Sequence, residues 1–233
     1  SGSIKVLVLL FSPKLFLIMS KSFSATYLIF FYFALFFLSC NNNTSSTSIH
    51  SPSKNIKIHI NCGKELTYKV KFDNKVVIKE SLLGINFKNG KKLFVEPDIV
   101  NVSETRIDYT WNLLWGEEKR IRNHYIEKTI SIKNRGNKLL IDLVFRAYDD
   151  GIAFRYNIKN KEGNSQNIVI TDEITQFNLI EDAEVWWTPA YGKIRYEELY
   201  HNSTISKMDS SHTPLTIRYS DGVHMSIHEA NLI

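Results

Sequence analysis

Hydrophobic and polar residues alternate along most of the chain after residue 54, and this period of two is typical of β-strands with one buried face. The alternation is clearest in segments 141–147 and 152–158, which are separated by Asp149, Asp150 and Gly151. Aspartate side chains can bond the backbone of a turn, and glycine accepts the positive φ that short turns require. The two segments therefore predict a β-hairpin with Gly151 as its positive-φ residue.

The same alternation predicts further short strands separated by turns that contain Asn, Asp and Gly. No amphipathic helix is expected beyond a single turn near Glu197. Many strands at short spacing, each with one apolar face, predict an all-β fold of two packed antiparallel sheets. The further predicted strands are 56–61, 66–72, 75–81, 84–88, 92–97, 106–113, 125–133, 167–174, 175–179, 184–189, 214–220 and 223–230.

Segment 19–40 has the organisation of a lipoprotein signal peptide. Lys21 precedes an apolar core at 27–38, and Ser39 places a small residue directly before Cys40. The apolar core is shorter than the roughly 20 residues of a membrane-spanning helix. We therefore expect export, lipidation of Cys40, and a periplasmic protein anchored to the outer membrane. An uncleaved signal anchor is the alternative interpretation.

Two more segments precede the expected folded domain. Residues 1–18 are apolar but are interrupted by a Pro-Lys pair, and we interpret them as non-native sequence upstream of a start at Met19. Residues 41–53 are rich in Asn, Ser and Thr without apolar periodicity, which predicts a flexible tether. Residues 54–233 are then expected to form the folded β-domain.

Composition argues against several classes of function. The formal net charge is +5, but the lysines are dispersed rather than gathered on one element, so nucleic-acid binding is not expected. With 2 cysteines in the chain, no internal disulfide can form in the folded part once Cys40 is lipidated. Cys62 lies in a predicted strand, where a buried and unreactive thiol is expected.

Four stretches carry a resemblance to a known family: VVIKESLLGINF at 76–87, WGEEKRIRNHYIE at 115–127, FRAYDDGIAFRY at 145–156 and HEANLI at 228–233. Their order and spacing resemble the N-terminal domain of glycoside hydrolase family 97. The resemblance implies an all-β, galactose-mutarotase-like β-supersandwich of antiparallel strands. It also implies a parent enzyme that is a bacterial exo-acting α-glucosidase or α-galactosidase, in which a catalytic (β/α)8 barrel and a small β-domain follow.

The catalytic barrel itself is not expected in this chain. Such a barrel needs roughly 250 residues of alternating strands and helices, whereas the segment after Cys40 is shorter and shows strand patterns only. Glycoside hydrolysis requires two carboxylates across the scissile bond, and the resemblance places both in the barrel. We therefore expect the chain to stop where the barrel would begin, to contain no catalytic residue and to be inactive alone.

The resemblance further implies a calcium ion in the active site of the complete enzyme, bound mainly by barrel carboxylates and by one glutamate of the N-terminal domain. That glutamate follows a Trp-x-Pro segment, here 187–189, so Glu197 is its match, or Glu198 if the loop is shifted by one residue. Ca²⁺ prefers six to eight oxygen ligands, so a site at a domain boundary can gather carboxylates from both sides. A solvated carboxylate pair is the alternative interpretation.

The four tryptophans of the chain allow two interpretations, because flat aromatic rings suit both sugar stacking and core packing. Trp186 and Trp187 are adjacent in a predicted strand and must point to opposite faces. We expect one of them to pack under a further layer, which in the full-length enzyme would be the barrel. Exposure at the rim of the sheet is the alternative, and Trp111 and Trp115 complete the set.

Two other motifs give no metal site or clear role. His228 and Glu229 begin like a zinc-protease pattern, but Leu232 replaces its second histidine. His224 lies about 13 Å from His228 by the rise of a strand, so no zinc site is expected there. The charged run 115–125 either braces the substrate mouth of the barrel or forms an internal polar network with satisfied partners.

These observations lead to one main functional hypothesis. The chain is expected to be the N-terminal domain of an exported, α-glucosidase-like glycoside hydrolase. It would dock on the barrel, shape the active-site pocket for α-linked oligosaccharides and supply one calcium ligand. The alternatives are a free-standing carbohydrate-binding β-sandwich lipoprotein and a periplasmic structural lipoprotein without a ligand.

Overall fold

A computed structural model describes most of the chain after its N-terminal region, namely residues 45–88, 90, 92–135, 139–159, 169–190 and 198–229. The predicted signal peptide with Cys40, the upstream segment 1–18 and the calcium candidate Glu197 lie outside the described residues. Within them, the chain forms β-strands and one 3₁₀ turn, η2 (Ile205–Lys207). No helix in this part is long and apolar enough to cross a membrane.

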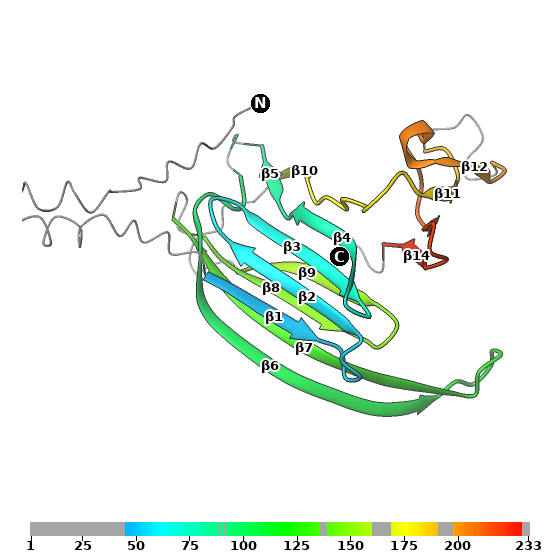
Figure 1. Cartoon of the computed structure of the whole chain (residues 1–233). Coiled ribbons are helices and arrows are strands. Elements are labelled where there is room, and N and C mark those ends of the chain that lie inside the picture. Colours follow the sequence, from blue (N-terminus) through cyan, green and yellow to red (C-terminus); the bar gives the residue numbers. More distant parts are fainter. Residues whose placement is uncertain are drawn as a thin grey trace, which may run out of the picture. The chain divides into compact units, whose positions relative to one another are not determined.

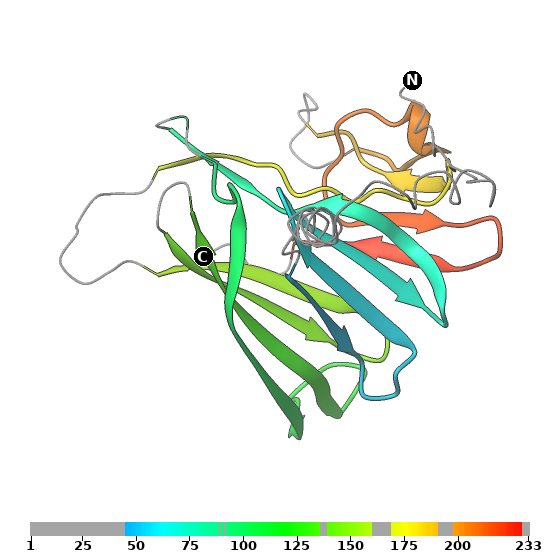
Figure 2. The same cartoon turned by 60° about the vertical axis from the view of Figure 1, so that its left-hand side comes forward.

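Two four-stranded antiparallel sheets form the main body, and Figures 1 and 2 show them as a blue-to-cyan and a green layer. The first sheet has the order β1-β2-β3-β4, with β1 (Ser45–His50), β2 (Ile56–Cys62), β3 (Leu66–Phe72) and β4 (Lys75–Leu82). The second has the order β6-β7-β8-β9, with β6 (Pro97–Asn112), β7 (Arg120–Asn134), β8 (Leu140–Ala147) and β9 (Ile152–Lys159).

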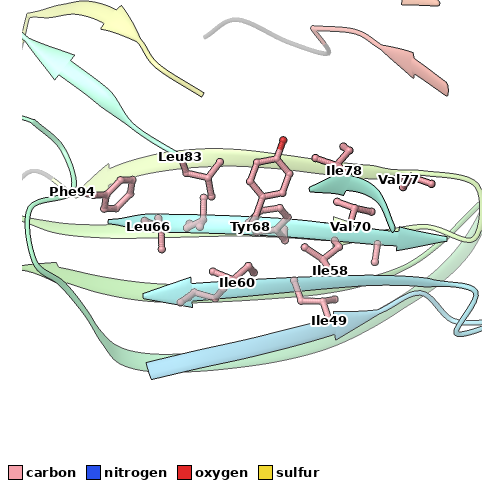
Figure 3. Close-up of a cluster of buried hydrophobic side chains, with 14 of the residues drawn as sticks. Ile49, Ile58, Ile60, Leu66, Tyr68, Val70, Val77, Ile78, Leu83 and Phe94 are labelled. Atoms are coloured by element: carbon pink, nitrogen blue, oxygen red, sulfur yellow. The ribbon is translucent and has the colours of Figure 1, made fainter. Parts of the chain in front are cut away.

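The alternating apolar residues of both sheets meet in one hydrophobic core. Ile58, Ile60 and Tyr68 contribute from the first sheet and are almost fully buried, and Figure 3 shows them among their neighbours. Ile141 and Leu143 of β8 belong to the same cluster. Burial of each aliphatic side chain stabilises the folded state by about 1.5–3 kcal/mol. Because the period of two places these side chains on one face of each strand, the two sheets are stabilised by packing these faces together.

Two smaller sheets complete the described part. One pairs β5 (Ile85–Phe87) with β10 (Ile170–Glu173). The other has the order β12-β11-β13-β14, with β11 (Glu184–Trp187), β12 (His201–Thr204), β13 (Leu215–Arg218) and β14 (His224–Ile227). The hydroxyl of Tyr219, just after β13, donates a hydrogen bond to the carbonyl of Val77 at 2.6 Å. This buried bond ties the C-terminal sheet to β4.

The predicted all-β fold of packed antiparallel sheets is confirmed, as is the β8–β9 hairpin, in which Ala147 pairs with Ile152. The predicted positive φ of Gly151 is wrong, because the glycines with positive φ in the described chain are Gly90, Gly116 and Gly222. The turn is instead closed by a bond from the Tyr148 amide to the Gly151 carbonyl at 2.9 Å.

Segment 41–53 is not a tether over its whole length, because Ser45–His50 forms the edge strand β1. Its pairing with β2 uses backbone groups and so needs no apolar periodicity, while Ile49 is fully buried. Residues 92–96 and 175–179 are not strands and contain only isolated bridges, whereas β6 begins at Pro97 and runs much further than predicted. The short strand β12 was not predicted.

Candidate functional site

The segment proposed for calcium binding connects two strands of the C-terminal sheet, β11 and β12. β11 ends at Trp187, and the backbone after it is fixed by bonds from His212 to Thr188 at 2.9 Å and from Ala190 to Ser210 at 2.8 Å. The chain returns to the same edge in β12, where His201 pairs with Trp187. The loop that carries the two glutamates therefore leaves and re-enters the sheet at one point.

Of the two calcium candidates, Glu198 lies within the described chain. It is half-buried and is followed by Leu199 and Tyr200, whose side chains are largely exposed. Among the described residues no ion-pair partner of Glu198 is found, and they contain no group of three or more His, Cys, Asp or Glu side chains that could hold a metal ion. A metal ion bound by Glu198 would need oxygen ligands from outside the described residues.

The adjacent tryptophans point to opposite faces of the sheet, as predicted. Trp187 is 7% exposed, belongs to the hydrophobic core and donates from Nε1 to the hydroxyl of Ser203 at 3.0 Å. Trp186 is half-buried, and the guanidinium of Arg218 lies 5.3 Å from the centre of its ring. Docking of either ring under a further layer stays a prediction.

A groove of about 780 Å³ lies between β4 and the C-terminal sheet. Its lining combines apolar side chains such as Phe177, Met208 and Ile217 with polar ones such as Glu80 and Asp209. Glu198 is not among the described residues that line the groove, and these residues do not gather a recognisable constellation of catalytic groups. It is therefore not assigned a role in the site.

The most unusual feature of the described chain is a two-stranded extension of the second sheet. β8 pairs with β7 only as far as Ile126, but β6 and β7 remain paired out to Asn112 and Arg120. We call residues 106–126 the arm, and Figure 1 shows it running beyond the ends of the other strands. The arm contains most of the charged run for which the sequence left two interpretations open.

One face of the arm is charged. Arg122 donates from Nε and Nη2 to the two carboxylate oxygens of Asp108 at 2.8 and 2.7 Å. His124 Nε2 lies 3.0 Å from Arg106 Nη2 and 4.0 Å from Asp108. The hydrogen bonds from Arg122 hold the pKa of Asp108 below its ordinary value. The network is satisfied as one interpretation required, but most of its side chains lie on an exposed surface.

The opposite face of the arm is aromatic. The rings of Tyr109 and Trp111 lie 5.6 Å apart, and both side chains are exposed. Nearer the sandwich, Tyr125 is buried, with the ring of Tyr148 at 4.9 Å and the guanidinium of Arg146 at 4.7 Å. The aromatic face is therefore buried at Tyr125, which is not one of the residues of the hydrophobic core, and exposed at Tyr109 and Trp111.

The tip of the arm is a loop, residues 113–119, closed by a bond from the Leu113 amide to the Lys119 carbonyl at 2.9 Å. Leu114 is 100% exposed and Trp115 is 86% exposed. The arm was not predicted as an element from the sequence. The signal that could have revealed it is the length of the strand pattern, which continues through 98–112 and 120–134 with neither Gly nor Pro.

The histidine motif near the end of the chain does not form a metal site in the described residues. His224 Nδ1 lies 2.9 Å from the carbonyl oxygen of Gly222, in the turn before β14. His228 follows the end of that strand. The assignment of no zinc role to either side chain stays a prediction.

Comparisons with known proteins give a consistent result. The sequence model of the family described as Glycosyl-hydrolase 97 N-terminal matches residues 49–233. A retaining alpha-galactosidase of Bacteroides thetaiotaomicron is 23% identical over 194 residues, which cover 79% of this chain and 28% of that protein. The chain therefore spans less than a third of the length of this relative.

Solved structures agree in fold and in coverage. A glycoside hydrolase family 97 enzyme of Pseudoalteromonas sp. strain K8, solved in complex with panose and with acarbose, matches with a TM-score of 0.76 and 34% identity. The match covers 80% of this chain and 29% of that enzyme. A beta-arabinopyranosidase at 19% identity and a TM-score of 0.67 shares the fold.

Proposed function

Because this chain belongs to the glycosyl-hydrolase 97 family through its N-terminal domain, we propose that it is the N-terminal part of an exported glycoside hydrolase. The observation that carries the proposal is the family match over 49–233, together with the 34% identical fold of a family 97 enzyme. In the relatives, more than two thirds of the length lies outside the matched domain. We assign hydrolysis to the corresponding remainder of the full-length protein.

The proposed substrates are α-linked oligosaccharides. Support comes from the names of the relatives, which include an alpha-galactosidase and an enzyme solved with panose and acarbose. The described residues contain no pair of carboxylates that we assign to opposite sides of a glycosidic bond, as the reaction requires. The role of this domain is to dock on the catalytic part and to shape one wall of its pocket.

The proposed calcium ligand is Glu197, with Glu198 as its replacement if the register shifts. The fit rests on the loop that leaves β11 after Trp187 and returns at His201, with the half-buried Glu198 near its end. A single carboxylate is a hard oxygen donor of the kind that Ca²⁺ selects, but it fills only one or two of the six to eight positions. The ion would therefore be shared with the catalytic part, where it would supply positive charge near the substrate.

Export and anchoring form a separate part of the proposal. The segment 19–40 supports a signal peptide, and its final Cys40 supports a diacylated anchor in the outer membrane, facing the periplasm. Metabolic labelling with a radioactive fatty acid would test this. We expect labelled wild-type protein and an unlabelled Cys40→Ser variant, whereas equal labelling of both would contradict lipidation.

Activity of the longer protein tests the function most directly. The protein encoded by the reading frame that continues past Ile233 is expected to hydrolyse nitrophenyl α-glucoside or α-galactoside. The 233-residue chain alone is expected to show no turnover above the level of a mock purification. Turnover by the isolated chain, or none by an intact longer protein, would contradict the assignment of catalysis to the remainder.

Calcium titration of the same longer protein tests the proposed ligand. Glu197→Gln is expected to raise the calcium concentration at half-saturation by at least about tenfold, since a charged oxygen ligand is lost. The matched control is Glu65→Gln, an exposed glutamate in the turn between β2 and β3. If only Glu198→Gln has an effect, the calcium ligand is Glu198. If neither variant changes calcium binding, the assignment of a ligand to this segment is wrong.

A further inference from the structure

We propose that the arm, residues 106–126 of β6 and β7, is the element by which this domain binds the polypeptide that follows it in the full-length protein. The inference rests on the proposed function and identifies the docking surface that the function requires. Its occupant is the catalytic part of the same chain. The contact surface is the aromatic face of the arm together with Leu114 and Trp115 at its tip.

The arm is isolated from the other strands of the second sheet. Beyond Ile126, the described strand β7 pairs with β6 alone, and the paired segment extends for about 20 Å at the rise of a β-strand. A two-stranded hairpin in water is marginally stable by itself, and stable sheets need more strands or a packed face. The charged face supplies some support through Asp108 and Arg122. On the aromatic face, Tyr125 is covered by Tyr148 and Arg146, but Tyr109 and Trp111 have no such cover among the described residues.

Polar and apolar side chains are unequally distributed over the two faces of the arm. On the charged face, the side chains of Arg106, Asp108, Arg122 and His124 bond or pair with one another, so that surface is already satisfied. On the other face and at the tip, Tyr109, Trp111, Leu114 and Trp115 expose large apolar areas. Side chains of this size at a protruding tip are typical anchors of protein contacts, where tryptophan and tyrosine dominate binding energy.

The length of the relatives favours the catalytic part of the same chain as the occupant. More than two thirds of the length of each family 97 relative lies outside the segment that this chain matches. A covalently attached part is present at high effective concentration and so binds without the entropy cost of meeting a separate molecule. A fully exposed aliphatic Leu114 beside Trp115 favours a protein surface over a sugar, since an aliphatic side chain offers no flat ring for stacking on a pyranose.

Hydrogen–deuterium exchange compares the longer protein with the 233-residue chain. Amides of residues 106–126 are expected to exchange at least about tenfold more slowly in the longer protein, since docking removes local opening of the hairpin. The β8–β9 hairpin, residues 140–158, serves as the internal control and is expected to change little. Equal exchange of the arm in both proteins would overturn the proposal.

A double variant, Leu114→Ala with Trp115→Ala, tests the contact side chains in the longer protein. It is expected to remove most of the arm protection and to leave the 140–158 hairpin unchanged. The matched control is Val100→Ala, which removes an exposed apolar side chain from β6 below the arm. Equal loss of protection from the control would overturn the assignment of the contact to the tip.

Two further measurements separate the other possible occupants. Sedimentation of the 233-residue chain tests for a dimer. If a dimer forms and the double variant abolishes it, the occupant of the arm is a second copy of the chain and not the catalytic part. If added panose slows amide exchange of the arm in the isolated chain, the occupant of the arm is a sugar and not the catalytic part. An active longer protein with an unprotected arm would overturn this inference alone, while a protected arm in an inactive longer protein would overturn the proposed function alone.

Discussion

Lys128 shows how single polar residues hold the sandwich together. Its side chain is almost fully buried, and its Nζ donates to the carbonyl of Ser48 at 2.6 Å and pairs with Glu104 at 2.8 Å. A buried ammonium group persists only when its donors are bonded. The contact joins the edge strand β1 to the opposite sheet, which explains why a Ser- and Thr-rich segment is ordered there.

Replacing this lysine tests that explanation. Lys128→Met keeps the apolar stem but leaves the Ser48 carbonyl without its charged donor, so the free energy of unfolding is expected to fall by about 1–3 kcal/mol. Lys133→Met, on the exposed side of the same strand, is the control and is expected to change it by less than about 0.5 kcal/mol. Urea unfolding measures both, and similar values for the two variants would contradict the role of Lys128.

Cys62 is expected to be chemically silent in the folded protein. Burial raises the pKa of its thiol to about 12, so the reactive thiolate is scarce at neutral pH. Iodoacetamide at pH 8 should label Cys62 only after unfolding in urea, as peptide mapping by mass spectrometry would show. Rapid labelling of the native protein would contradict its burial.

The raised pKa of Cys62 also makes stability depend on pH. Since the folded pKa is the higher one, this group stabilises the fold below about pH 8.5 and loses that contribution as pH rises further.

At the scale of elements, the turns of the chain do not all depend on glycine in the same way. Gly151, in the β8–β9 turn, has no positive φ, and nothing lies within 4 Å of the position that a Cβ would take. Gly222, in the turn between β13 and β14, has a φ of +86°. Gly222 therefore has a backbone conformation that favours glycine and Gly151 does not, although both belong to Asp-Gly pairs.

Alanine substitution should separate these two glycines. Gly151→Ala is expected to stabilise the protein by about 0.4–1 kcal/mol, because it reduces the freedom of the unfolded chain without strain. Gly222→Ala is expected to destabilise it by about 1–2 kcal/mol, because alanine is strained at positive φ. Thermal unfolding of the two variants should shift in opposite directions, and a shared direction would contradict the turn geometry.

The charged face of the arm should respond to acid. Hydrogen bonds from Arg122 lower the pKa of Asp108 in the folded chain, so the pair stabilises the arm above the unfolded aspartate pKa of about 3.9. This contribution is lost as pH falls through the lower folded value. Carboxylate NMR should place the Asp108 midpoint below the ordinary aspartate value of about 3.9.

Removing the arginine supplies the control for that titration. Arg122→Gln keeps a polar side chain on the arm but removes the charge and the paired donors. The midpoint of Asp108 should then rise toward the ordinary aspartate value. An unchanged midpoint would show that Arg122 is not the cause of the shift.

At the scale of the whole molecule, the sandwich was predictable because apolar residues recur at every second position in most of its strands. Ile141, Leu143 and Phe145 point into one core and are fully buried, so their spacing alone reveals the buried face. The strand β1 and the length of β6 could not be read in this way. Their pairing is carried by backbone bonds, and much of β6 lies outside the core with exposed residues on both faces.

The candidate site was predictable only in part, for a related physical reason. Opposite directions for Trp186 and Trp187 follow from strand geometry, and the structure confirms them. The assignment of Glu197 depends on ligands that a second part of the protein would supply, and one domain's sequence contains no spacing that encodes them. The arm was not predicted as an element, although the strand pattern through 98–112 and 120–134 contains neither Gly nor Pro.

The central claim is that this domain is the front part of a glycoside hydrolase whose catalytic part follows it. The most direct measurement is the sequence of the transcript beyond the codon for Ile233. The account predicts an open reading frame long enough for a (β/α)8 barrel, roughly 250 further residues with alternating strand and helix patterns. A stop codon directly after Ile233 would contradict it, because no catalytic part would then be joined to the domain.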